Sequence, residues 1–415
     1  MLALNTENPK VSKGSERRNI FALGFVSFFT DMSNEMIFSL LPTFLLGLPG
    51  SSRIALGLIE GTAEALSYAL RAVSGFFSDK FRKRKLFVLA GYGVSNFVKP
   101  LFSIAKVPLD IFIIRVSDRI GKAVRTSPRD ALLSESVSEK RHGIAFGSHR
   151  TLDQAGAIIG PLIAFTMLIF LGLTVREVFW LSLIPGTIAL LIILFGVREH
   201  IGKSKGEFQF LVGVKSILRG DFSLLLLIVG VFSLGAFNFS FVLLNAKEAG
   251  VADSLIPLVY AILNIAHTAI AIPAGILSDR IGKEKVLSLG YGVFLFTSLS
   301  ILLFPANNFN AFFVAISFGT YMGIIETIQR AIIPGYVESS LRGTAYGLYY
   351  LIVGLSFFIS NAVVGTLWEY FGSSIAVTYS AAASSFAIAG MFVFLILQTR
   401  KKGKSAVISP LWSVF

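Results

Sequence analysis

The sequence predicts an all-α membrane protein with twelve transmembrane helices in two pseudo-symmetric six-helix bundles. Three observations support this fold class: an apolar composition, about twelve apolar stretches, and an internal repeat. Of the 415 residues, 54% are hydrophobic and 15% are charged, whereas soluble proteins carry about 25% charged residues. The mean hydropathy is +0.74, so water is not expected to be the main solvent of the chain.

Each apolar stretch is long enough to cross a bilayer, which takes about 20 residues. In hydrocarbon the backbone groups find no water to bond, so each stretch is expected to form a helix. The expected helices are 19–48, 54–78, 86–105, 107–130, 143–172, 177–197, 222–246, 254–278, 286–304, 309–334, 343–371 and 374–398. The expected parts are a tail 1–18, a first bundle 19–197, a linker 198–221, a second bundle 222–398 and a tail 399–415.

The first apolar stretch is interpreted as a permanent helix. It carries Asp31 and Glu35 and has no small-residue cleavage site, which is unlike a cleaved signal peptide.

The formal charge of +13 raises nucleic acid as a partner, but the positions of the cations argue against it. They gather in both tails and in alternate loops, at 10–18, 80–85, 198–219, 280–285 and 400–404. The opposite loops hold Arg53, Lys106, Arg176 and Lys247. This asymmetry predicts a multi-pass protein of the cell (plasma or inner) membrane with both termini in the cytoplasm. Anionic inner-leaflet lipid is the expected partner of the basic loops.

The chain has no cysteine, which excludes disulfides and thiol metal sites. No cofactor and no metal site are predicted, and a monomer is expected. No candidate nucleophile with an activating base is recognised, so an enzyme is not expected.

The two halves repeat each other at an offset of about 200 residues. Segment 75–80 (GFFSDK) matches 275–280 (GILSDR), 91–94 matches 290–293, and 143–147 matches 343–347. A duplicated six-helix unit explains these matches, and such repeats typically place a substrate site at the midplane between two halves.

Segment 75–85 resembles the loop motif between helices 2 and 3 of the major facilitator superfamily, with Arg82 in place of a glycine that the copy 275–285 retains as Gly282. Segment 156–161 (GAIIGP) resembles the family's antiporter motif, although Ile163 and Ala164 replace its final glycine pair. The resemblance covers the whole chain, and drug:proton antiporter-like prokaryotic members are the nearest likeness. It implies alternating access and a small-molecule substrate.

The resemblance also implies a cytoplasmic gate. Asp79 ends the second helix, where an anion is unfavourable unless a positive group is near. The family's geometry places it against the helix start near Gly343 and against an arginine, for which Arg129 is the candidate. Asp279 is the repeat counterpart of Asp79. A simple solvated loop is the alternative.

Ionisable residues inside the expected spans give the candidate site. Each costs about 2.5–3.5 kcal/mol at the bilayer centre on insertion scales, so these residues must face one another or water. Most of them lie in the first half. Arg115, Arg119, Lys122, Arg125 and Arg129 share one helical face. Counting turns puts the following at similar depth: Asp31, Glu35, Glu64, Arg115, Asp118 and Arg119.

This cluster has two interpretations. One is a salt-bridge lattice that holds helices together. The other is a proton site or substrate anchor, in which a carboxyl group responds to desolvation and to neighbouring cations. Asp31 and Glu35 are the candidates for proton coupling, because no cation lies within a turn of them on their own helix.

The fifth expected helix brings His149 and Asp153 onto the face of Gly156 and Gly160. His149 is a candidate proton carrier, and a packed histidine bonded to Asp153 is the alternative. The second half is expected to offer shape and polar contacts to substrate, from Asn238, Asn264, Glu326, Gln329 and Asn361.

The function expected first is proton-coupled export of a small organic compound by a secondary transporter. Uptake or exchange of an organic anion is the second hypothesis, and a ferroportin-like divalent metal exporter is the third. A membrane receptor without transport is the alternative of a different class.

Overall fold

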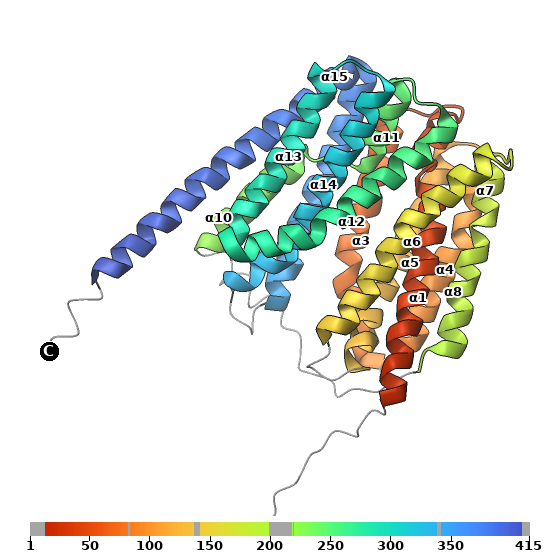
Figure 1. The fold of residues 1–415 in the computed structure, drawn as a ribbon, viewed down its shortest axis with the longest axis horizontal. Helices are drawn as coiled ribbons and strands as arrows, with labels where there is room; N and C mark the ends of the chain where they lie inside the picture. Colours follow the sequence, from red (N-terminus) through yellow and green to blue (C-terminus); the bar gives the residue numbers. More distant parts are fainter. Residues whose placement is uncertain are drawn as a thin grey trace, which may run out of the picture. The chain divides into compact units, whose positions relative to one another are not determined.

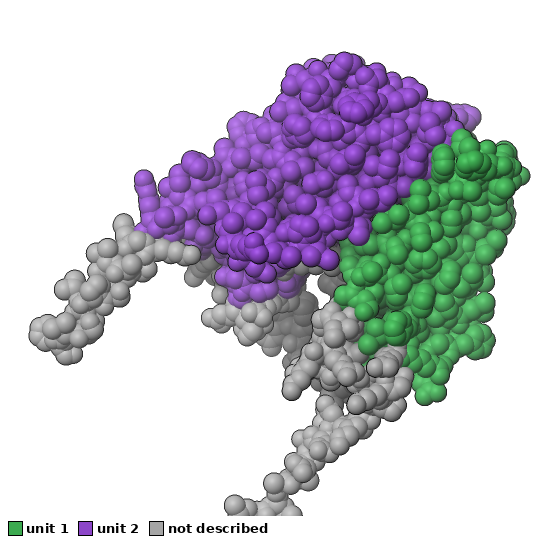
Figure 2. Space-filling view, viewed as in Figure 1, with its two compact units in different colours: residues 1–41, 69–207 green, residues 42–68, 208–415 purple. Residues whose placement is uncertain are grey.

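Most of the part that the structure describes is helical. The computed structural model describes residues 13–81, 84–136, 142–198, 218, 220–337 and 342–408, and the side chains at 13–17, 71–83, 135, 142–146, 330, 342–343 and 401–408 are outside that description. Compact packing groups Met1–Leu41 with Ala69–Glu207 as unit 1 and Pro42–Tyr68 with Phe208–Phe415 as unit 2 (Figure 2). No strand occurs among the described residues.

Unit 1 is built on close pairs of helices. Its elements are α1 (Lys13–Phe38), the second part of α3 (Arg53–Phe81), α4 (Arg84–Val98), η1 (Lys99–Ile104), α5 (Pro108–Glu135), α6 (His142–Ile169), α7 (Val175–Leu181) and α8 (Leu183–Gly196). α1 packs against α6 and α8, and α4 packs against α5 and α8 (Figure 1). The α1–α6 pair brings the acids of α1, Asp31 and Glu35, against the helix that carries Arg150 and Asp153.

Unit 2 repeats this style of packing with other contacts. Its elements are α2 (Leu41–Leu46), the first part of α3, α10 (Asp221–Gly235), α11 (Phe239–Glu248), η3 (Asp253–Leu255), α12 (Ile256–Ile281), α13 (Lys283–Leu303), α14 (Asn308–Ile332), η4 (Ile333–Gly335) and α15 (Arg342–Ile408). α12 packs against α14, and α10 and α13 pack against α15. Gly372, at φ 82°, interrupts the helical backbone of α15, so this element is two helices joined at a glycine.

The helix positions agree closely with those expected from hydropathy. Among the described residues, eight helical stretches are long and apolar enough to cross a membrane. α1, α3 and α5 are not among those eight. The total of twelve spans stays a prediction, as do the expected domain boundaries. The tails and the linker 198–221 fall largely outside the described residues.

Residues 42–68 belong to the first expected bundle but pack within unit 2. The reason lies in α3, where Gly57 and Gly61 meet α15 closely. A Cβ at Gly57 would lie 2.1 Å from the carbonyl oxygen of Asn361, and one at Gly61 would lie 3.0 Å from that of Phe358. Further along α3, Tyr68 stacks on Tyr350 with ring centroids 5.5 Å apart.

Two basic side chains cap the carboxyl end of α8, where the last carbonyl groups lack hydrogen-bond partners within the helix. Arg18 donates to the carbonyl oxygens of Phe195 and Gly196 at 2.6 and 3.0 Å. Lys85 donates to those of Leu194 and Val197 at 2.9 and 2.8 Å. Cations also interact favourably with the negative end of the helix dipole. At these two positions the basic segments therefore stabilise the fold, in addition to any contact with lipid.

The α1–α6 interface depends on two glycines in α6. A Cβ at Gly156 would lie 2.2 Å from the carbonyl oxygen of Phe28, and one at Gly160 would lie 2.5 Å from that of Met32. Because these contacts are with backbone atoms, the helices would have to move apart to admit a side chain. Small residues of this kind permit close helix approach in membranes. The glycine–proline segment thus has a packing role that needs no assumption about transport direction.

We predict that Gly156→Ala destabilises the protein by about 1–3 kcal/mol through overpacking, seen as a lower thermal unfolding midpoint in detergent. Gly147→Ala is the matched control, because Gly147 is in the same helix and has nothing within 4 Å of the added carbon. That control is expected to be neutral or slightly stabilising, since alanine favours helix over glycine. Equal midpoints for the two variants would contradict the prediction.

Candidate functional site

Two carboxyl groups from different helices meet in unit 1. Asp31 of α1 and Asp153 of α6 are joined by a side-chain hydrogen bond. A carboxylate only accepts, so this bond requires a proton on one of the pair. Asp153 also accepts from Ser27 Oγ at 2.7 Å and from Arg150 Nη1 at 2.8 Å. These two donors stabilise the carboxylate form of Asp153.

A buried lysine lies next to this pair. Lys99, which is 1% exposed, donates from Nζ to Ser33 Oγ and to Asn34 Oδ1, both at 2.8 Å. Asn34 Nδ2 in turn donates to Asp31 Oδ1 at 3.1 Å. The α4 helix gives way to the 3-10 turn η1 at Lys99, with Pro100 in its first positions, and this turn directs Lys99 toward α1.

The buried face of α5 carries an acid surrounded by cations. Asp118 is buried and interacts electrostatically with Lys99, Arg119, Arg115 and Arg125, in that order of strength. Arg115 Nη1 lies 3.9 Å from Asp118 Oδ2. Lys99 therefore links the Asp31–Asp153 pair to the α5 cluster.

Aromatic rings cover two of these arginines. The guanidinium carbon of Arg115 lies 3.8 Å from the centroid of Phe38, and that of Arg125 lies 4.1 Å from the centroid of Tyr92. Arg119 lies 5.7 Å from the Phe38 centroid. Cation–π contacts of this kind contribute about 2 kcal/mol when desolvated, which helps to keep buried arginines charged.

The other expected residues of the first half are placed as follows. Glu35 interacts electrostatically with Asp31 and Lys99, so it belongs to the same group. Glu64 lies in the part of α3 that packs in unit 2. His149 is 6% exposed, and its Nε2 has no hydrogen-bond partner among the described atoms. Asp153 is bonded to Asp31, Ser27 and Arg150, so a His149–Asp153 hydrogen bond is not among the contacts of the described residues.

The expected gate is only partly visible. The side chain of Asp79 lies outside the described residues, and Arg129 forms an ion pair with the adjacent Asp130 at 2.8 Å. Asp279 is exposed near the end of α12. The gate therefore stays a prediction.

The expected contacts of the second half divide into two kinds. Asn238 caps α11 by accepting from the Ser240 amide, and its own backbone amide donates to Asn361 Oδ1 at 2.9 Å. These two side chains support the break between α10 and α11. Glu326 lies 3.4 Å from His267 Nε2 of α12. Asn264 is buried on α12, and Gln329 is half-buried on α14.

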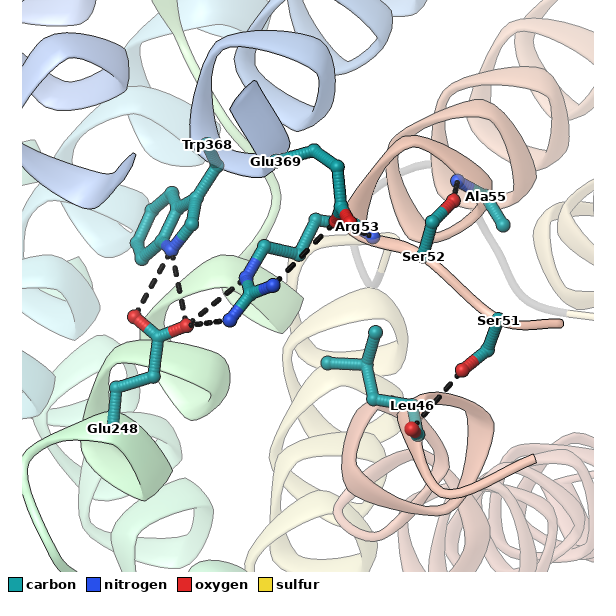
Figure 3. A network of polar contacts seen from close by, with 8 residues as sticks. All are labelled: Leu46, Ser51, Ser52, Arg53, Ala55, Glu248, Trp368 and Glu369. Atoms are coloured by element: carbon teal, nitrogen blue, oxygen red, sulfur yellow. Dashed lines mark hydrogen bonds and ion pairs between the residues drawn. The ribbon is translucent and has the colours of Figure 1, made fainter. Parts of the chain in front are cut away.

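An ion-pair network at the start of α3 joins three elements of unit 2 (Figure 3). Arg53 donates from Nη2 and Nε to Glu248 Oε1 at 2.7 and 3.0 Å, and its backbone amide donates to Glu369 Oε2 at 2.8 Å. Trp368 Nε1 donates to Glu248 Oε2 at 3.0 Å. We name Arg53, Glu248, Trp368 and Glu369 the Arg53 latch, because together they fasten α3 to α11 and α15.

Sequence reasoning did not include Lys99, His267 or the Arg53 latch in the candidate site. Lys99 carries a usable signal, since it is a cation within an expected span followed directly by a proline. The sequence places Arg53 in an expected loop, and its partners Glu248 and Glu369 are far away along the chain. His267 has no acidic residue within a turn on its own helix.

The family is decided by comparison with known proteins. The family model described as Major Facilitator Superfamily matches residues 23–245 and 223–413. The chain belongs to this superfamily. It is therefore a transporter with an all-α, multi-pass membrane fold.

Relatives and solved structures agree with this family. An uncharacterised MFS-type transporter of Methanocaldococcus jannaschii is 34% identical over 358 residues, covering 85% of this chain and 89% of the relative. The multidrug resistance protein MdtG of Proteus mirabilis is 25% identical over 312 residues, covering 71% and 76%. The crystal structure of the nucleoside transporter NupG superposes with a TM-score of 0.72 at 12% identity, covering 91% of this chain and 98% of that one. At that identity the likeness shows the fold alone.

We predict that Arg53→Met loosens the start of α3, because the Arg53 latch is the polar fastening of that end. A single cysteine at Leu56, which is 1% exposed, should then react several-fold faster with a maleimide, in line with the modest strength of partly exposed ion pairs. The chain has no cysteine of its own, so this label reports one position. Lys247→Met is the control, since it removes the neighbouring 3.0 Å pair with Asp253 and leaves the latch intact. Unchanged labelling in Arg53→Met would contradict the prediction.

Proposed function

We propose that this protein is a secondary active transporter that exports a small organic compound in exchange for protons, by alternating access. The observation that carries the proposal is the Asp31–Asp153 carboxyl pair, in which two acidic side chains meet between α1 and α6. A carboxyl pair is suited to coupling because a like charge nearby opposes full ionisation. Loss of the proton leaves two anions in contact, which favours a change in the α1–α6 packing or the binding of a cation.

The relatives support the direction of transport without naming a substrate for this chain. One of them is a multidrug resistance protein, and export of small organic compounds is what that name implies. We place the protein in the cell membrane with both termini in the cytoplasm, because the basic residues gather in the tails and in alternate loops.

Exchange of an organic anion is a second candidate, favoured by one observation. Lys99, Arg115, Arg119 and Arg125 are all buried in unit 1, whereas Asp118 is the only carboxylate of the described part of that unit with comparable burial. Such an excess of buried cations is costly, and an anionic substrate would offset it. Among the described residues no group of three or more potential ligands could hold a metal ion, so no contact supports the metal-export hypothesis.

The deciding measurement is flux in proteoliposomes with an imposed pH gradient, over a panel that contains cationic dyes, neutral aromatics and aromatic carboxylates. Gradient-driven accumulation of a member of the panel is the expected result. Accumulation of carboxylates alone would favour the second candidate. Binding without gradient-dependent movement of any compound would overturn the proposal and favour a receptor.

We predict that Asp31→Asn reduces gradient-driven flux to the level of empty vesicles while substrate exchange at equal pH continues, because the variant cannot release a proton. Asp110→Asn is the control, since Asp110 is a partly exposed carboxylate that caps α5 by accepting from the backbone amides of Lys106 and Val107. Flux in Asp31→Asn that keeps the wild-type dependence on pH would rule out Asp31 as the coupling residue.

A further inference from the structure

The contacts of Lys99 form a polar chain with a defined direction. The chain runs from Lys99 to Asn34, from Asn34 to Asp31, and from Asp31 to Asp153. Lys99, Ser33 and Asn34 are 1%, 0% and 4% exposed, so solvent is largely excluded from the first links. The bonds therefore depend on one another rather than on water.

The ammonium of Lys99 fixes the orientation of the Asn34 amide. An ammonium has donors and no acceptor, so Asn34 must turn its oxygen toward Lys99. The amide group is rigid and planar, so its nitrogen is then directed at Asp31. Asp31 thus receives a donor, and hydrogen bonding from a donor favours the carboxylate form.

Ser33 gives an internal comparison. Its hydroxyl donates to the carbonyl oxygen of Ser182 at 2.8 Å, so its lone pair accepts from Lys99. Ser33 therefore binds the same ammonium as Asn34 does, whereas the contact to Asp31 comes from Asn34. A role that consists only of anchoring Lys99 would involve Ser33 and Asn34 equally.

We propose that Lys99 is a positioning residue for proton release, which acts through Asn34 by setting whether Asp31 meets a donor or an acceptor. Without the ammonium the amide is free to turn its oxygen to Asp31, which suits a protonated carboxyl group. Asp31 then keeps its proton to higher pH. The inference rests on the proposed proton coupling at Asp31 and deepens it by naming a residue that regulates that step.

Other charged groups also lie near Lys99 and Asp31, the two residues that Asn34 connects. Asp31 interacts with Asp153 of α6, Lys122 of α5 and Glu35 of its own helix. Lys99 interacts with Asp118 and Arg125 of α5 and with Asp31 and Glu35 of α1. A charge at Lys99 thus also reaches Asp31 directly through space. The experiment has to separate that direct effect from the effect carried by Asn34.

A double-mutant cycle read by infrared spectroscopy makes this separation. The carboxyl stretch of Asp31 is assigned in the purified full chain by its loss in Asp31→Asn and is then titrated with pH, which needs no substrate. We predict that Lys99→Met and Asn34→Leu each raise the titration midpoint by about one pH unit, whereas Ser33→Ala leaves it unchanged. The double variant should match Lys99→Met and not show the sum of the two shifts, because the contact through Asn34 is already lost when Lys99 is replaced.

Additive shifts in the double variant would show that Lys99 acts only through space and would overturn the inference. An equal shift in Ser33→Ala, or none in Asn34→Leu, would also overturn it. Lys99→Gln provides a second neutral variant if Lys99→Met does not give folded protein.

The flux assay separates this inference from the proposed function. If gradient-driven flux is lost in Asp31→Asn but the titration midpoint of Asp31 is unchanged in Lys99→Met, the inference is wrong and the proposed function stands. If the Asp31 titration midpoint shifts in Lys99→Met and Asn34→Leu but the wild-type protein shows no gradient-driven flux, the proposed function is wrong and the inference stands.

Discussion

The need to keep ionised side chains away from hydrocarbon governs the amino-terminal unit. Lys99, Arg115 and Asp118 are almost fully buried, and each such group is stable there only with partners at close range. The partners come from different elements: α1 supplies Asn34 and Phe38, η1 supplies Lys99, and α5 supplies the arginines and Asp118. The polar contacts therefore determine which helices lie together, and any proton site in this unit is part of the same set of contacts.

Close helix packing is what brings these partners within reach. Gly156 and Gly160 let α6 approach the backbone of α1, and that approach places Asp153 against Asp31. In unit 2 the glycines of α14 do the same, since a Cβ at Gly323 would lie 2.4 Å from the carbonyl oxygen of His267. On the same two helices, His267 Nε2 lies 3.4 Å from Glu326 Oε2. Glycine positions thus decide which ionisable groups can meet in each unit.

The core of unit 2 contains a cluster of aromatic rings, whereas unit 1 buries charged groups in addition to its apolar core. Phe232 stacks on Tyr291 with centroids 3.9 Å apart, and Phe237 stacks on Phe318 at 5.6 Å. Stacked and edge-on ring pairs contribute about 0.5–1.5 kcal/mol of stability beyond that of burial. This contribution does not depend on the protonation state of any side chain. The two units therefore differ in the side chains that they bury.

Hydropathy was sufficient to predict the all-α membrane fold and the helix positions, because lipid imposes that pattern on each helix separately. The superfamily was predicted from the resemblance of segments 75–85, 275–285 and 156–161 to the family's motifs. The pairing of side chains was not predictable in this way. Asp31 was expected from its depth, but its bond to Asp153 and its link to Lys99 join residues 122 and 68 positions apart. Arg53 and Glu369 are 316 positions apart. Such partners are selected by the rotation and approach of packed helices, which depend on all neighbouring side chains at once, so only the tertiary structure decides them.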